Sequence, residues 1–211
     1  MNSNKYLEDI TEIKKMMNRS SRFISLSGLS GVLAGIYALI GAYFAKNTLV
    51  AHSAMDSAAY AQRNSMPLQD NLTLNLAFIA GCVVLAAMLT GIILSIRKAK
   101  KSEERIWNKV SRRLVFHFFM PLLAGGMFCI ALIQNGSSGL VASATLLFYG
   151  LACVNASKYT LGDVKYMGLA FIILSLVSTQ FLGYGLYFWA LGFGLFHIIY
   201  GAMMYFKYER S

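Results

Sequence analysis

The sequence has little charge and almost no proline. Of its 211 residues, 13% are Asp, Glu, Lys or Arg and only two are proline. That charged share is about half of what an average soluble domain carries. By contrast, 57% of the residues are hydrophobic, and the mean hydropathy is +0.55. Because a soluble domain of 23.3 kDa could not bury that much apolar surface, the composition disfavours a soluble enzyme and predicts a polytopic membrane protein.

Carboxylates are absent from the apolar stretches, since all nine Asp and Glu residues lie outside them. Ion-coupled transporters and proton pumps usually keep an acidic side chain within the membrane. Its absence argues against carboxylate-based proton or sodium coupling. The three cysteines (Cys82, Cys129 and Cys153) lie inside apolar stretches without a partner at disulfide or metal-ligand spacing, so we predict neither a disulfide framework nor a metal site.

Six apolar runs reach or approach the length of about 20 residues that a helix needs to cross a bilayer. They lack the alternation of transmembrane barrel strands. We therefore predict an all-α fold in which residues 1–211 form a single membrane domain with six transmembrane helices. The predicted spans are Phe23–Ala45, Leu74–Ile96, Leu114–Gln134, Ser138–Asn155, Val164–Phe181 and Gly183–Phe206.

The basic residues predict the orientation of these spans. Seventeen of the nineteen Lys and Arg residues fall on one side of the membrane, and only Lys46 and Arg63 fall on the other. The positive-inside rule then places both termini in the cytoplasm. Because topology accounts for the net charge of +10, we do not expect a nucleic acid as a partner.

Three segments lie between or beside the spans. Residues 4–17 have the spacing of an amphipathic helix, which we expect to lie along the lipid bilayer. The basic residues 97–113 are expected to continue the second span as a helix before the chain turns back. The Ala-rich start of residues 46–73 is expected to extend the first span and to end before Met66–Pro67. Residues 1–22 and 97–113 could instead dock a cytoplasmic protein.

Two spans carry residues that weaken a helix near its midpoint. The third has Pro121, Gly125 and Gly126, and the sixth has Gly192 and Gly194. The third and sixth spans occupy corresponding positions if the fold is a 3+3 inverted repeat. A sequence similarity between the first spans of the two halves supports such a repeat, since SGLSGVLAGIYALIGA in the first span resembles SGLVASATLLFYGLAC in the fourth. Paired interruptions at corresponding positions indicate a binding site in transporters. The glycines also have a simpler explanation, because glycine is common in membrane helices for packing alone.

From this pattern we predict a small-molecule site. Its polar contacts would come from His117, Tyr149 and His197. The predicted ligand-binding residues are Pro121, Gly125, Gly126, Gly192, Gly194, His117, Tyr149 and His197.

The two histidines within spans suggest two further hypotheses. A haem shared by His117 and His197 is disfavoured because their depths differ by about 8 Å, so no cofactor is predicted. A rhomboid-like protease would pair Ser138 of a GSSG sequence with His197, but the two lie about 20 Å apart in depth. A nucleophile and its base must meet within about 3 Å, and a GLSG sequence recurs at Gly28–Gly31. We predict no catalytic residue and keep the protease as a remote alternative.

Small residues recur at four-residue steps in the first two spans, at Ser27, Gly31 and Gly35 and at Ala87 and Gly91. Such stripes allow helices to approach closely in lipid. We therefore expect a neighbouring helix against each stripe.

The opening of the first span, RSSRFISLSGLSGVLAGIYALIGAY, resembles the start of a group of uncharacterised six-span bacterial inner-membrane proteins. This resemblance implies a location in the bacterial inner membrane and no activity. Together with the residues above, it leads us to expect a protein that binds or transports a small molecule without carboxylate-based ion coupling. The alternative is a non-catalytic signalling or scaffold module that engages a cytoplasmic regulator, and an oligomer is compatible with either.

Overall fold

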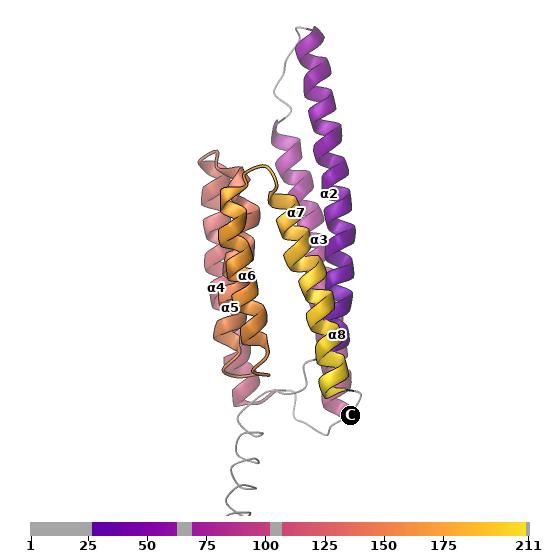
Figure 1. Cartoon of the computed structure of the whole chain (residues 1–211), viewed down its shortest axis with the longest axis vertical. Coiled ribbons are helices and arrows are strands. Elements are labelled where there is room, and N and C mark those ends of the chain that lie inside the picture. The colour runs from indigo at the N-terminus through magenta and orange to yellow at the C-terminus, as the bar shows by residue number, and fades with distance from the viewer. Residues whose placement is uncertain (1–26, 63–68, 102–106, 210–211) are drawn as a thin grey trace, which may run out of the picture. The chain divides into compact units, whose positions relative to one another are not determined.

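The computed structural model describes residues 27–62, 69–101 and 107–209, and this part of the chain is helical without any strand. The all-α prediction is therefore confirmed. The amphipathic helix expected over residues 4–17 lies outside the described residues. The helices in Figure 1 are α2 (Gly28–Gln62), α3 (Gln69–Lys101), α4 (Lys109–Gln134), the 3₁₀ turn η1 (Ser138–Leu140), α5 (Val141–Ala156), α6 (Val164–Gln180), α7 (Gly185–Trp189), the π-helix η2 (Ala190–Phe196) and α8 (His197–Tyr208).

Among the described residues, five stretches are long and apolar enough to cross a membrane, as in a multi-pass membrane protein. The remaining predicted span is α6, a shorter apolar helix of 17 residues. In chain order the six predicted spans correspond to α2, α3, α4, η1–α5, α6 and the continuous run α7–η2–α8. The five long stretches are Gly28–Ala54, Leu72–Lys101, Lys109–Gln134, Ser138–Ala156 and Gly185–Tyr208.

The first two spans continue as helices beyond their apolar parts. With 35 residues, α2 is about 52 Å long, against a hydrocarbon core of about 30 Å. It ends at Gln62, before Met66–Pro67, so the predicted extension is confirmed. The predicted continuation of the second span is also confirmed, since α3 ends at Lys101 with three lysines in its last turn. Cations at this end of a helix interact favourably with its dipole.

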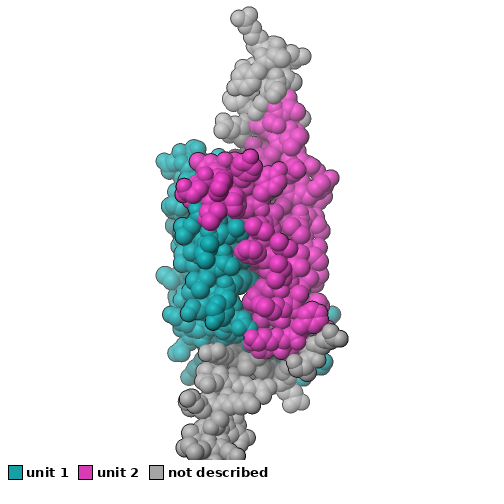
Figure 2. Space-filling view, in the orientation of Figure 1, with its two compact units in different colours: residues 1–26, 95–176 teal, residues 27–94, 177–211 magenta. Residues whose placement is uncertain are grey.

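The chain divides into two compact units, coloured separately in Figure 2. Unit 1 comprises residues 1–26 and 95–176, and its described part holds α4, α5 and most of α6. Unit 2 comprises residues 27–94 and 177–211 and holds α2, most of α3 and the run α7–η2–α8. The single domain expected over residues 1–211 stays a prediction.

In unit 1, α5 packs closely against both α4 and α6. An added Cβ on Gly150 of α5 would lie 2.7 Å from the carbonyl oxygen of Gly168 of α6, and the converse distance is the same. Nearby, Ser175 Oγ donates a hydrogen bond of 2.7 Å to the carbonyl oxygen of Ser143. The core between these helices includes Leu146 and Phe171, which are fully buried.

In unit 2, the start of α2 lies against the end of α8. An added Cβ on Gly31 would lie 3.1 Å from Gly201 Cα. Glu209, just past α8, accepts hydrogen bonds from the backbone N–H of Gly28 and, at 3.5 Å, from Ser27 Oγ. A carboxylate at this position satisfies one of the N–H groups that the first turn of a helix leaves without an intrahelical partner. The two ends of the described chain are therefore joined.

The predicted small-residue stripes have different outcomes. In the first span, Gly31 and Gly35 do meet a neighbouring helix, the sixth span, as expected. In the second span, an added Cβ on Gly91 would meet no atom of the described structure within 4 Å. The helix α3 instead meets α2 through Val83, which touches Gly41, and through Thr90, whose Oγ1 lies 3.3 Å from Tyr37 Oη.

Candidate functional site

The sixth span is interrupted where its glycines predicted a weak point. Residues Ala190–Phe196 form a π-helix between α7 and α8, and both Gly192 and Gly194 are buried in it. Short π-helical segments within α-helices occur frequently at functional sites. The irregularity is therefore real, and it takes the form of a changed helical pitch.

His197 lies at the end of this π-helix and is buried, with 8% of its surface exposed. Its Nδ1 lies 3.3 Å from the carbonyl oxygen of Gly192, and its ring stacks on Phe193 with the centroids 5.9 Å apart. The π-helix thus positions a buried imidazole beside the backbone carbonyl of Gly192. Gly194 serves packing, because an added Cβ there would collide with the side chain of Leu39 of α2.

In the third span, Pro121 lies inside the continuous helix α4. Proline has no N–H, so the carbonyl four residues earlier, that of His117, loses its intrahelical donor. Asn155 of α5 supplies the missing donor, since its Nδ2 donates a hydrogen bond of 2.9 Å to the His117 oxygen. Neighbouring helices satisfy such freed carbonyls in membrane proteins, where no water can do so.

The imidazole of His117 is held by a second partner in the same unit. Tyr159, in the turn after α5, stacks on it with the centroids 4.7 Å apart, and Tyr159 Oη lies within 3.0 Å of His117 Nε2. His117, Pro121, Asn155 and Tyr159 therefore form one connected cluster, which we name the His117 cluster.

Three other predicted site residues of unit 1 do not belong to the His117 cluster. Gly125 is buried against Phe148 of α5, and an added Cβ would collide with that ring. Tyr149 lies between two rings, 5.9 Å from Phe118 and 4.9 Å from Phe171. Gly126 is exposed, and an added Cβ would meet nothing within 4 Å in the described structure.

The structure therefore distributes the predicted site residues over both units. Unit 1 holds His117, Pro121, Gly125, Gly126 and Tyr149, and unit 2 holds Gly192, Gly194 and His197.

Sequence reasoning missed Asn155 and Tyr159. The signal for Asn155 was present, because a proline inside a span always frees one carbonyl, which needs a donor from elsewhere.

Other chemistry receives little geometric support from the described residues. No three His, Cys, Asp or Glu side chains among them gather as a metal site would require. Ser138 begins η1 in unit 1 while His197 belongs to unit 2, so neither unit contains the serine–histidine pair of the protease alternative. Most of the expected docking surface (residues 1–22 and 102–106) lies outside the described residues.

No protein-family model, curated protein or solved structure matches the chain significantly.

Proposed function

We propose that this protein binds and transports a small molecule across the membrane, without carboxylate-based ion coupling, on a 3+3 inverted-repeat scaffold. In this scaffold, spans one to three form one half and spans four to six form the other. An odd number of spans in each half inverts one half relative to the other, as in many secondary transporters.

The way in which the six predicted spans are grouped into the two compact units carries this proposal. Unit 2 holds spans one, two and six, and unit 1 holds spans four, five and three. Exchanging the halves of a 3+3 repeat turns one, two and six into four, five and three. Each unit therefore combines two spans of one half with the last span of the other.

The packing within the units supports the same equivalence. In unit 1 the last span of the first half, α4, packs against the first span of the second half, α5. In unit 2 the sixth span packs against α2, the first span. In both pairs a glycine near the middle of the last span accepts a large side chain, with Gly125 facing Phe148 and Gly194 facing Leu39.

The two helix-perturbing features also occupy equivalent places. Pro121 lies in span three, where α4 stays continuous and the His117 carbonyl loses its donor, and the π-helix lies in span six. Irregular backbone at corresponding positions of two repeats is typical of transporter binding sites. We assign the main ligand contact to the π-helix and His197. None of the five membrane-length stretches contains an Asp or Glu, which favours a mechanism without a coupling carboxylate.

We assign the chain to the bacterial inner membrane with both termini in the cytoplasm. Glu209 joins the end of the last span to the start of the first, so an even number of crossings accounts for the path of the chain. Seventeen Lys and Arg residues mark that side as cytoplasmic.

The proposal is tested by ligand screening of the full-length protein in mild detergent. A panel of amino acids, sugars, nucleosides and organic cations is added, and the melting temperature is measured. We expect at least one compound to raise it, since a ligand that binds the folded state stabilises that state. His197→Phe keeps the ring stacking and removes the nitrogens, so this variant should lose the ligand-induced shift.

His52→Phe is the matched control, because it makes the same replacement in α2, outside the π-helix. It should keep the ligand-induced shift. A panel without any stabilising compound would contradict the binding function, and an unchanged shift in His197→Phe would contradict the assignment to the π-helix.

A further inference from the structure

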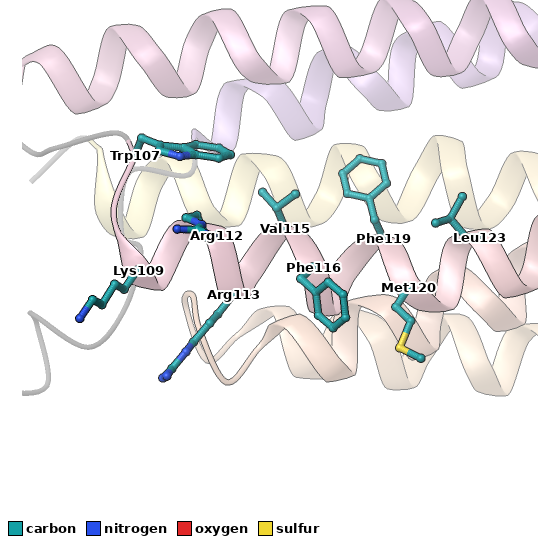
Figure 3. A pocket seen from close by; sticks show the side chains of 9 residues that line it. All are labelled: Trp107, Lys109, Arg112, Arg113, Val115, Phe116, Phe119, Met120 and Leu123. Carbon is teal, nitrogen blue, oxygen red and sulfur yellow. The ribbon is translucent and has the colours of Figure 1, made fainter.

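An open groove of about 670 Å³ runs along the face of α4 (Figure 3). The nine described residues that line it belong to α4 or directly precede it. Two rows of side chains form its edges, one on each side of the helix in Figure 3. The lining residues are Trp107, Lys109, Arg112, Arg113, Val115, Phe116, Phe119, Met120 and Leu123.

This face points away from α5. The residues of α4 that are buried, including Gly125 against Phe148, lie on the opposite side of the helix. On the groove side, Phe116 is 64% exposed and Leu123 is 68% exposed. The groove is therefore a surface of α4 that α5 does not cover.

The groove has a cationic end and an apolar remainder. Lys109, Arg112 and Arg113 occupy the first turn and the start of the second, and none of them pairs with an acidic side chain in the described part of the chain. Beyond Arg113 every lining side chain that the structure describes is apolar. Arginine presents donors that match the geometry of a phosphate, and lysine adds a compact positive charge.

The beginning of α4 is fixed by a capping box, which orders the backbone from which these cationic side chains extend. The Asn108 side chain accepts hydrogen bonds from the backbone N–H groups of Val110 and Ser111, and Ser111 Oγ accepts one from the Asn108 N–H. Trp107 directly precedes this cap and is exposed. Tryptophan is enriched at the level of lipid headgroups.

The length of the apolar part equals the depth of one leaflet. From Arg113 to Leu123 the helix rises about 15 Å, which is half of the hydrocarbon core of about 30 Å. We infer that the groove binds an anionic phospholipid, whose phosphate lies on Arg112, Arg113 and Lys109 and whose acyl chain lies along Phe116, Met120 and Leu123. A free phosphate would use only the cationic end and would leave the apolar part uncovered.

The fluorescence of Trp107 reports occupancy directly. The protein has two tryptophans, so Trp189→Phe leaves Trp107 as the single emitter. This variant is titrated, in detergent micelles, with phosphatidylglycerol or phosphatidylcholine carrying the same brominated acyl chains, which quench indole on contact. We expect half-quenching at a several-fold lower mole fraction of phosphatidylglycerol than of phosphatidylcholine.

Removing the two arginines should abolish this preference. In the Trp189→Phe background, Arg112→Gln with Arg113→Gln should raise the phosphatidylglycerol fraction at half-quenching by about tenfold or more, because each basic residue near the surface contributes to anionic-lipid binding. Lys158→Gln with Lys165→Gln removes the same charge from exposed positions of unit 1 outside the groove and should keep the preference. Phe116→Ala with Leu123→Ala should weaken quenching by both lipids, because the apolar contacts are common to both.

Four results would overturn the inference. Equal quenching by the two lipids would show no anionic headgroup site. An effect of the lysine pair equal to that of the arginine pair would show only general charge attraction. Relief of quenching by excess inorganic phosphate would show a small-anion site. Native mass spectra in which the arginine variant loses a dimer while its lipid response is unchanged would identify a second copy of the chain as the occupant.

Discussion

At the scale of single residues, Pro121 and Asn155 act as a pair although they are on different helices. Proline removes a backbone donor from the middle of α4, and the side chain of Asn155 replaces it at the carbonyl of His117. The polar side chain of Asn155 in an apolar span therefore has a structural reason.

This pairing predicts a specific coupling between two substitutions. Asn155→Leu should destabilise the protein by about 1–2 kcal/mol, since it leaves the His117 carbonyl without a donor. The same substitution should have much less effect in a Pro121→Ala background, where the N–H of residue 121 can bond that carbonyl again. The measurement is a double-mutant cycle of thermal unfolding in detergent. Equal effects of Asn155→Leu in both backgrounds would show that the hydrogen bond contributes nothing.

At the scale of the helices, the amino-acid pattern predicted most of the elements. Each of the six predicted spans is a helix, five of them long and apolar enough to cross a membrane, and the Ala-rich and Lys-rich extensions of α2 and α3 were also correct. The pairing of helices was not predictable in the same way. Glycines such as Gly150, Gly168 and Gly201 are ordinary in a membrane helix, and only the three-dimensional arrangement shows that each faces backbone of another helix.

The candidate site, too, was predicted only in part from the sequence. The glycines of the sixth span correctly indicated an irregular helix, but not that it would be a π-helix with His197 at its end. Tyr159 was missed because its partner, His117, lies 42 positions away in the sequence. Pairwise contacts over such a separation leave no periodic signal in a single sequence.

Close glycine contacts between α5 and α6 predict a sharp difference between two equal substitutions. Gly168→Val should lower the melting temperature, since an added Cβ would lie 2.7 Å from the Gly150 carbonyl oxygen and would also press on Val154. Overpacking of this kind costs about 1–3 kcal/mol. Gly91→Val makes the same change where an added Cβ meets nothing within 4 Å in the described structure, so it should leave the melting temperature nearly unchanged. Equal losses in the two variants would contradict this account of the α5–α6 contact.

At the scale of the whole molecule, sequence order and spatial grouping differ. Each unit takes two consecutive spans from one half of the chain and one span from the other half. The chain therefore does not divide into sequential domains, because cutting between spans three and four would remove a helix from each unit. The contact of Glu209 with the start of α2 links the first and sixth spans within unit 2.

The proposed orientation predicts which parts of the chain are accessible from each side of the membrane. In a background with Cys82, Cys129 and Cys153 replaced by alanine, single cysteines are introduced as Ala54→Cys and Lys158→Cys. Both positions are exposed, one about 39 Å along α2 from Gly28 and the other in the turn after α5. A membrane-impermeant maleimide should label Ala54→Cys in intact bacterial cells whose outer membrane has been made permeable. It should label Lys158→Cys only after the inner membrane is also opened, and that second labelling is the control for reactivity. The reverse pattern would place the seventeen basic residues outside and contradict the assignment from the positive-inside rule. Labelling of both positions in intact cells would place both on the outer side. The chain would then cross the membrane an even number of times between residues 54 and 158, which contradicts the proposed odd number.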